Sequence, residues 1–317
     1  MGAKDTATIK YMRQNEIFAD AFNYFVYGGK QVISPDSLEE LDTRELDVPY
    51  GGAFGEKQPV QRTRDVIKAV TTMTDNRIAY MVVAIEAQSN IHYAMPVKNM
   101  VYDALQYAKQ VEKAVASHKI SGDYKNVGSD EYLSGFMKKD YLMPVVTLVV
   151  YFDSKPWDGP MSLHEMFEYK NQEVLALVPD YKINLIAPAA IQDEDFGKFA
   201  STLKEVLAFI KYSKDTDKLE KIVNSDAGFQ RLGRKEVDVL NSCVNANLEM
   251  KDNEEVLNMC EAIQGMMKKA ADRERITTKL NDIQNLMRKM NLTVEQSMDI
   301  LDVAESDREE LNQLLVK

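Results

Sequence analysis

The chain has 317 residues, a length that suits one large domain with an appended segment. Hydrophobic residues make up 45% and charged residues 28%, as in ordinary globular proteins, and no apolar run approaches the roughly 18–20 residues of a membrane span. The formal net charge of −11 argues against a protein that coats nucleic acid, because such binding needs concentrated Lys and Arg. A nucleic-acid enzyme with a local basic face or bound metal ions remains compatible with this charge.

The cysteines and the first residues bear on the cellular compartment. Cys243 and Cys260 have no partnering His nearby and fit neither a zinc site nor a disulfide framework. The opening segment MGAKDTATIKYMRQNE has no apolar stretch, so we expect no secretory signal. We therefore predict a cytoplasmic protein without a membrane partner.

The first predicted element is a helix over residues 9–27. Aromatic residues recur there at a spacing of four, as in Phe18 and Phe22, and Gly28 then ends the helix. Residues 30–60 contain several Pro residues and the sequence YGGAFG, so they predict a long connection with one short strand.

The segment RDVIKAVTTMTDNRIAYMVVAIEAQS predicts a β-hairpin. Two β-prone runs meet at Asp75-Asn76, a pair suited to a tight turn. If this pair forms a two-residue turn, residues whose numbers sum to 151 lie opposite each other, and Asp65 then faces Glu86. Strand side chains alternate between faces, so Gln88 shares the face of Glu86. The hairpin thus gathers Asp65, Glu86 and Gln88 at its open end.

The segment MPVKNMVYDALQYAKQVEKAV predicts the next helix, with Pro96 near its first turn. The predicted apolar stripe consists of Val97, Val101, Ala104, Ala108, Val111 and Val115. Another side carries Lys98, Tyr102, Gln106 and Lys109.

The middle of the chain predicts further strands and helices. We expect an exposed loop over residues 117–140 and a strand covered on both faces over residues 142–152. A turn and a short helix from about residue 161 follow. The segment DYKINLIAP predicts one more strand, and residues 192–212 a helix.

From residue 213 the sequence becomes helical in pattern, rich in Lys and acidic residues. Residues 268–289 carry seven Lys/Arg and three Asp/Glu, whereas residues 295–310 carry seven acids and one Arg. A capped helix beginning at Thr293 lies between these charge blocks. The pattern predicts a helical hairpin or a self-association module, and we expect residues 261–317 to drive oligomerisation.

The paired carboxylates suggest a cation site. Two neighbouring carboxylates repel each other unless they are protonated or bridged by a cation, and a hard ion such as Mg²⁺ or Mn²⁺ suits them. Such an ion can polarise a phosphodiester and lower the pKa of an attacking water. A third acid could come from the first helix, Asp20 or Glu16. The alternative reading is an Asp–Glu pair and a Lys-bearing helix that simply face solvent.

The segments RDVIK, IEAQS and MPVKNMVYDALQY together resemble the recombination-promoting nuclease / putative transposase family of the PD-(D/E)XK nuclease superfamily. The segments FADAFNYFVYGGKQVISPDSL, PWDGPMSLHEM and VPDYKINLIAP resemble it too, so the resemblance covers residues 9–212. The tail LMRKMNLTVEQSMDILDV resembles the family's C-terminal helices. The resemblance implies an α/β fold: a PD-(D/E)XK restriction-endonuclease-like core, with a mixed central sheet flanked by helices, and a C-terminal helical region. We accordingly expect a nuclease-like domain over residues 1–212 and a helical region over residues 213–317.

The resemblance also implies roles for individual residues. Asp65 takes the place of the superfamily aspartate, Glu86 that of the acid in (D/E)-x-K, and Gln88 that of its lysine. Asp65, Glu86 and the carbonyl of Ala87 would then hold the metal, while Gln88 would orient the attacking water or a phosphate. An amide carries no positive charge, and Lys98 could restore it from the next helix.

Two further assignments follow from the same resemblance. Asp20 is our match to the acid of the first helix. Substrate DNA would lie over the helix that carries Lys98, Tyr102 and Lys109, and over the basic stretch 268–289.

The sequence therefore predicts a Mg²⁺- or Mn²⁺-dependent DNA endonuclease associated with recombination or mobile elements. One alternative is a true DNA transposase, although a DDE-type site needs a different acid spacing and fold. The other is a degenerate nuclease fold that acts as an interaction module through its helical tail. The amide of Gln88 and the overall acidity keep this second alternative open.

Overall fold

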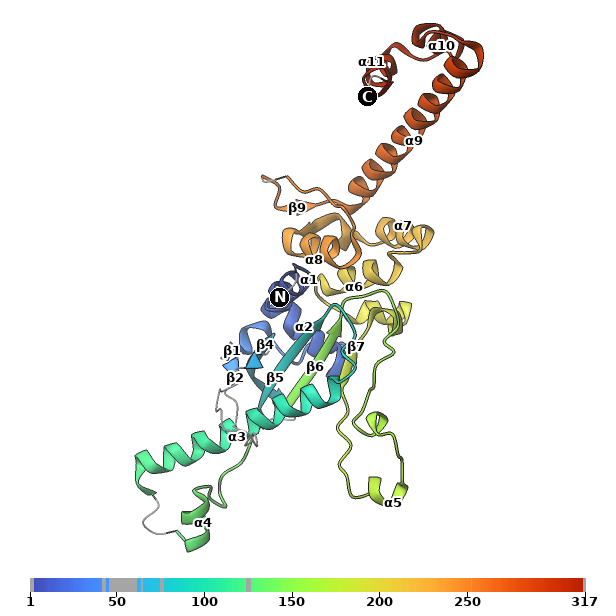
Figure 1. Cartoon of the computed structure of the whole chain (residues 1–317). Helices are drawn as coiled ribbons and strands as arrows, with labels where there is room; N and C mark the ends of the chain where they lie inside the picture. Colours follow the sequence, from blue (N-terminus) through green and yellow to red (C-terminus); the bar gives the residue numbers. More distant parts are fainter. Residues whose placement is uncertain are drawn as a thin grey trace.

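The structure, a computed structural model, describes residues 3–41, 44–45, 62–63, 65–74, 77–123, 127–251 and 253–315. Its centre is a mixed five-stranded sheet in the order β1-β4-β5-β6-β7 (Figure 1). The strands are β1 (Leu38–Glu40), β4 (Val66–Thr74), β5 (Arg77–Gln88), β6 (Val145–Tyr151) and β7 (Asn184–Ile186). The pairs β1–β4 and β4–β5 are antiparallel, whereas β5–β6 and β6–β7 are parallel.

The β4–β5 hairpin has the predicted register. Val66 pairs with Ile85 and Thr74 pairs with Arg77, so the residue numbers of each pair sum to 151. The predicted turn, residues 75–76, lies outside the described part of the chain. This register decides which side chains of the two strands share a face.

Two helices, α1 (Ala3–Met12) and α2 (Asn15–Tyr27), stand where the sequence predicts a single first helix. The single helix predicted over residues 9–27 is therefore wrong at its start, because Gln14 has an extended backbone (φ −64°, ψ 131°). The buried Lys68 stabilises this break: its Nζ donates to the carbonyl of Arg13 at 2.8 Å and to the Asn15 side chain. Gly28, with φ +62° in the left-handed region, ends α2 as predicted.

Helix α3 (Met95–Ser121) crosses the sheet on one side (Figure 1). Its buried side chains are Met95, Pro96, Asn99, Tyr102, Asp103, Gln106 and His118. The predicted apolar stripe is therefore wrong, since Val97 and Val101 are only half-buried and Ala104 is exposed. The sheet face under α3 is itself polar at Glu86 and Thr147, and this explains why a polar side of the helix packs there.

The opposite sheet face is apolar and is covered by α1, α2 and α6 (Leu203–Tyr212). The buried core on this side runs from Ile9 to Met259 and includes residues of α8 (Arg234–Val244). The core is therefore continuous across residue 212. The domain boundary that the sequence predicts at this residue stays a prediction.

The last helices form a second, smaller core. These are α9 (Met259–Met290), α10 (Val294–Ile300) and α11 (Glu305–Leu315). Their buried residues are Ile276, Ile283, Met298, Val303 and Leu311. Thr293 caps α10 in a capping box with Gln296, as predicted. Helix α9 projects away from the sheet and the chain folds back at its far end (Figure 1), so the predicted helical hairpin is confirmed.

Short elements complete the described chain. They are β2 (Arg44–Glu45), β3 (Arg62–Thr63), α4 (Ser129–Ser134), α5 (Gln172–Leu175), α7 (Thr216–Ser225), β8 (Leu232–Gly233), β9 (Val256–Leu257) and the 3₁₀ turns Pro35–Ser37, His164–Met166, Pro188–Ala190, Asp193–Lys198 and Ala227–Arg231. The predicted loop over residues 117–140 thus contains the end of α3 and the short helix α4, and the predicted helix over 192–212 is helical in the α form only from Leu203. No helix in the described ranges is long and apolar enough to cross a membrane.

Candidate active site

Asp65 and Glu86 meet at the open end of the β4–β5 hairpin. Asp65 directly precedes β4, and its Oδ2 accepts a hydrogen bond from the backbone N–H of Ala87 at 2.9 Å. Val66 pairs with Ile85 at the end of the β4–β5 ladder, so the next residue out, Asp65, lies opposite Glu86. The structure therefore brings the two carboxylates together, as the hairpin predicts, with Ala87 held between Glu86 and Gln88.

Lys98 is the cationic partner of Glu86. Its Nζ, in the first turns of α3, lies 2.7 Å from Glu86 Oε2. The Glu86 side chain is 1% exposed and that of Lys98 is 24% exposed. Burial acts to lower the pKa of Lys98, but the ion pair with Glu86 raises that pKa above its ordinary value. The ammonium group therefore stays charged at neutral pH.

The carboxylate of Asp65 is hard to ionise. Burial, and after it the charge of Glu86, raises the pKa of Asp65 to about 7, although Lys98 and the N–H of Ala87 act in the opposite direction. One ammonium group is thus insufficient to neutralise two neighbouring carboxylates. A second cation at this point would favour the ionised form of both acids.

The donor set fits a hard divalent ion. Carboxylate oxygens, with a backbone carbonyl and water, are the ligands that Mg²⁺ prefers, and it is usually held by one or two carboxylates. Within the described ranges no group of three or more His, Cys, Asp or Glu side chains could hold a metal ion. An ion at this point would therefore have two carboxylates, those of Asp65 and Glu86, as its acidic ligands.

Gln88 and Tyr102 border the carboxylate pair. Gln88 is the last residue of β5 and is half-buried, and its side chain is on the face of Glu86 because strand residues alternate. Tyr102 is buried one turn after Lys98, whose Nζ lies 5.8 Å from the centroid of the Tyr102 ring. Lys109 is eleven residues further along α3 than Lys98, about 16 Å at the rise of an α-helix, and is therefore not part of the cluster.

Asp20 does not join this cluster, which corrects the expectation drawn from the first helix. Its carboxylate accepts hydrogen bonds from the backbone N–H groups of Ala200 and Ser201, each at 2.9 Å, and from Ser201 Oγ at 2.5 Å. Asp20 is 2% exposed and belongs to α2, on the apolar side of the sheet. It stabilises the turn that leads into α6.

A different acid from the first helices lies near the site. Asp5 of α1 accepts a hydrogen bond from Ser89 Oγ at 2.8 Å, directly after β5. After burial and Glu86, the charge of Asp5 also contributes to the raised pKa of Asp65. Sequence reasoning missed Asp5 because neither the spacing in α1 nor the motif around Glu86 distinguishes it from an ordinary surface acid.

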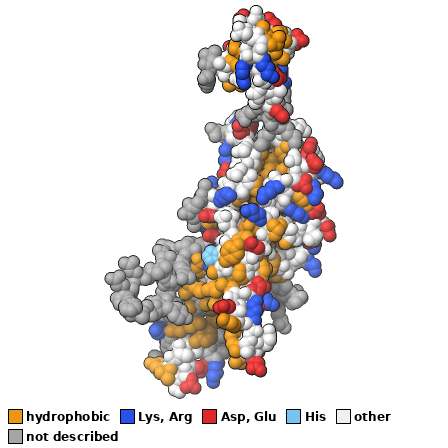
Figure 2. Space-filling model, turned by 45° about the vertical axis from the view of Figure 1, so that its right-hand side comes forward, with side chains coloured by type: hydrophobic (Ala, Val, Ile, Leu, Met, Phe, Trp, Pro, Cys, Tyr) orange, Lys and Arg blue, Asp and Glu red, His pale blue; other side chains and the backbone are white. Residues whose placement is uncertain are grey.

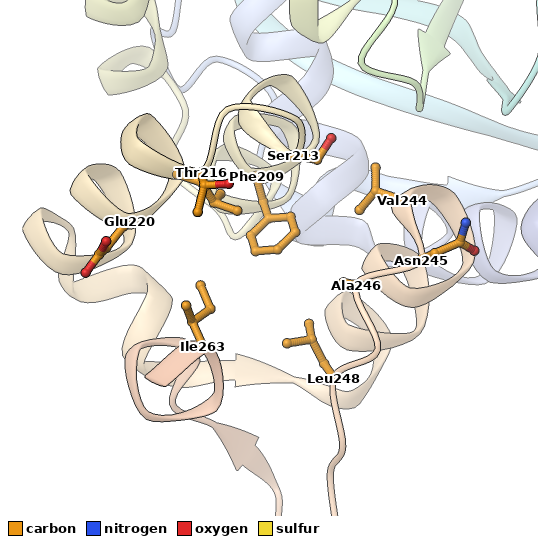
Figure 3. Close-up of a pocket in the computed structure, with 10 residues that line it drawn as sticks. Phe209, Ser213, Thr216, Glu220, Val244, Asn245, Ala246, Leu248 and Ile263 are labelled. Atoms are coloured by element: carbon orange, nitrogen blue, oxygen red, sulfur yellow. The ribbon is translucent and has the colours of Figure 1, made fainter. Parts of the chain in front are cut away.

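A pocket of about 250 Å³ lies elsewhere, between α6, α7, the end of α8 and α9 (Figure 3). Its walls are mostly apolar, with Phe209, Leu248 and Ile263 pointing into it, and the polar groups of Ser213 and Glu220 lie at its rim. The pocket is not lined by Asp65, Glu86, Gln88 or Lys98. The pocket therefore belongs to the packing of the C-terminal helices.

A mixed sheet with an acidic cluster at the end of its central hairpin, followed by a helix across the same face, defines a PD-(D/E)XK-type fold. The profile of the family described as "Putative transposase, YhgA-like" matches residues 31–239 of this chain. The chain belongs to this family, a group of transposase- and nuclease-like proteins, which confirms the resemblance seen in the sequence. No curated protein and no solved structure matched the chain.

Proposed function

We propose that the protein is a metal-dependent DNA endonuclease that hydrolyses phosphodiester bonds in the recombination of mobile elements. The observation that supports this proposal is the close placement of Asp65 and Glu86, whose burial and mutual repulsion raise the pKa of Asp65 to about 7. Such a pair is unfavourable without a cation and suits a divalent ion. Membership of the transposase- and nuclease-like family agrees with this chemistry.

In this proposal Asp65 and Glu86, with the carbonyl of Ala87, would hold Mg²⁺ or Mn²⁺. An ion held there would supply polarisation of a phosphodiester and a lowered pKa of a bound water. Gln88 offers an amide donor and an amide acceptor at the end of β5, on the face of Glu86, and can orient a water or a phosphate oxygen.

Lys98 provides the positive charge that Gln88 lacks. It reaches the site from α3 rather than from β5, and its raised pKa keeps it protonated. The ring of Tyr102 beside Lys98 restricts the space open to the ammonium group. Lys98 is therefore suited to stabilise the charge that develops on a phosphate during hydrolysis.

DNA is the proposed partner, contacted through local charge. On the face drawn in Figure 2, the Lys and Arg side chains of the described residues are interspersed with Asp and Glu and form no continuous basic surface. Arg275 and Lys279 of the basic stretch 268–289 already bind Asp307. We therefore place the DNA over the first half of α3, at Lys98 and Tyr102, with Lys109 further along it.

Plasmid cleavage by purified protein tests the proposal. Wild type should nick DNA with Mg²⁺ or Mn²⁺ and not with EDTA, whereas Asp65→Asn should lose at least about 100-fold in rate while its circular dichroism spectrum is unchanged. Asp36→Asn changes an exposed acid and should cut like wild type. Equal cutting by wild type and Asp65→Asn would overturn the assignment. Folded wild type that neither cuts nor gains stability with Mn²⁺ would favour the interaction-module alternative.

We also propose self-association through the C-terminal helices. Their charges pair within one chain, so the contact between copies would have to use exposed apolar side chains such as Met290 and Ile300, which are 61% and 56% exposed. Light scattering of wild type and of the double variant Met290→Glu/Ile300→Glu tests this. Identical masses for the two proteins would contradict it.

A further inference from the structure

Asn99 is a fully buried amide with no hydrogen-bond partner among the residues that the structure describes. Its exposed fraction is 0%, and among the described residues neither its Oδ1 nor its Nδ2 has a hydrogen-bond partner. An asparagine side chain offers two donors and an acceptor oxygen, and buried amides in folded proteins are nearly always hydrogen-bonded. A polar group other than the described side chains is therefore expected to satisfy it, and water is the smallest candidate.

Asn99 lies over the strands that carry the carboxylate cluster. It is on the buried stripe of α3 between Met95, which packs against Val149, and Asp103, which accepts a hydrogen bond from Thr147 Oγ1 at 2.5 Å. Val149 pairs with Glu86 in the parallel β5–β6 ladder. Asn99 also directly follows Lys98, the partner of Glu86. Asn99 therefore lies in the buried interface between α3 and the sheet, one residue after the partner of Glu86.

The attachment of α3 to the sheet does not depend on Asn99. Asp103 secures this part of the helix, because it accepts hydrogen bonds from both Thr147 Oγ1 and Tyr181 Oη, each at 2.5 Å. An apolar residue at position 99 would be buried on the same stripe of α3 as Met95. A structural role thus explains the burial of residue 99 but not its amide.

We propose that Asn99 is a positioning residue of the active site, which binds a buried water that fixes the Glu86 carboxylate for divalent-cation binding. A carboxylate has about four acceptor sites, so Glu86 can accept from such a water in addition to its ion pair with Lys98. Polar groups behind a metal ligand commonly change metal affinity about 10–100-fold. This inference rests on the proposed metal-dependent function.

The test measures Mn²⁺ binding to the full chain by titration calorimetry, together with thermal unfolding. Asn99→Leu removes the amide but keeps the branching and the number of heavy atoms of the side chain, and it should weaken Mn²⁺ binding about tenfold. Its melting temperature in EDTA should equal or exceed that of wild type, because a buried unsatisfied amide is replaced by an apolar group. Asn99→Ser replaces the amide with a hydroxyl and leaves room for water, and it should bind Mn²⁺ within about threefold of wild type.

The outcomes separate this inference from the proposed function. Wild-type affinity in a folded Asn99→Leu variant would overturn the role of Asn99 and leave the metal site intact. If Asn99→Leu fails to fold, Asn99→Ser decides: a loss as large as tenfold in this variant would also overturn the water-binding role. Wild-type protein that binds no Mn²⁺ would overturn the metal site itself, and the inference with it.

Discussion

Lys98 Nζ lies 2.7 Å from Glu86 Oε2, so the carboxylate proposed to hold a metal ion already has a cationic partner on the neighbouring helix. A divalent ion bound at Glu86 would therefore stabilise the same buried charge as the ammonium group. Either cation would then compensate in part for the loss of the other.

Replacing Lys98 with Met tests this relationship. The metal-free variant should lose about 2 kcal/mol of stability, less than the roughly 3–5 kcal/mol of a fully buried broken pair, because the Lys98 side chain is 24% exposed. Mn²⁺ should then raise the melting temperature of the variant more than that of wild type. Thermal unfolding in EDTA and in Mn²⁺ measures both effects. Lys113→Met, an exposed position on the same helix, is the control, and equal Mn²⁺-induced shifts in all three proteins would contradict the prediction.

The raised pKa of Asp65 predicts a pH dependence of stability. Burial and the charge of Glu86 raise that pKa from 3.8 to about 7, so the folded chain keeps its proton to higher pH than the unfolded chain. The contribution to stability is fully present below about pH 4 and is lost as the pH rises to about 7. Wild type in EDTA should thus lose about 3 kcal/mol relative to Asp65→Asn over this window.

Urea unfolding of both proteins at pH 5 and pH 8 measures the difference. Mn²⁺ at pH 8 should return the lost stability to wild type and not to Asp65→Asn. A wild-type-minus-variant difference that does not change with pH would show that Asp65 ionises normally.

The carboxylate cluster was predictable because a hairpin has few degrees of freedom. Once Asp75-Asn76 is taken as the turn, the alternation of strand side chains fixes Asp65 opposite Glu86, and the observed pairing of Val66 with Ile85 confirms the register. The capping box at Thr293 was equally local, since it depends only on a residue three positions further on.

Other features depend on contacts between distant segments. Asp20 was assigned to the site by its place in the first helix, but the N–H groups that it binds lie 180 residues away, before α6. The break at Gln14 depends on Lys68 of β4, whose ammonium binds the carbonyl of Arg13. The burial of Asp103 depends on Thr147 of β6, which donates a hydrogen bond to it. Periodicity within one helix carries no information on any of these partners.

The hydrogen bonds of His118 with Asp123 and Asp140 predict a pH-sensitive contact at the C-terminal end of α3. Hydrogen bonding to Asp140, and to a lesser degree to Asp123, outweighs burial and raises the pKa of His118 above its ordinary value. A raised histidine pKa stabilises the folded form below the ordinary value near 6.5, and this stabilisation is lost as the pH rises through the folded pKa. The segment 127–144 should therefore exchange its amide hydrogens faster, after correction for intrinsic rates, above that pKa.

An NMR titration of the imidazole checks the cause. Asp140→Asn should lower the pKa of His118 more than Asp123→Asn does, because Asp140 is the larger contributor. Asp130→Asn, at an exposed position of α4, should leave it unchanged. The same pKa of His118 in all four proteins would contradict the predicted contact with Asp140 and Asp123.

The ion pairs of Asp307 with Arg275 and Lys279 predict what stabilises the C-terminal core. Its carboxylate binds Arg275 through two hydrogen bonds of 2.7 and 3.2 Å and Lys279 through one of 3.0 Å, and the bond to Lys279 is the largest factor that lowers its pKa. It thereby joins α11 to α9 beside the apolar contacts of Ile276 and Leu311.

The variant Asp307→Asn keeps the shape of the side chain but removes the negative charge that attracts Arg275 and Lys279. Amide exchange in residues 293–315 should accelerate on the order of tenfold, while exchange in β5 and β6 is unchanged, because the two buried cores are separate. Asp302→Asn changes an acid of the same segment for which no ion pair is seen among the described residues, and it should exchange like wild type. Faster exchange that extends to β5 and β6 in Asp307→Asn would show instead that the C-terminal helices and the sheet unfold as one cooperative unit.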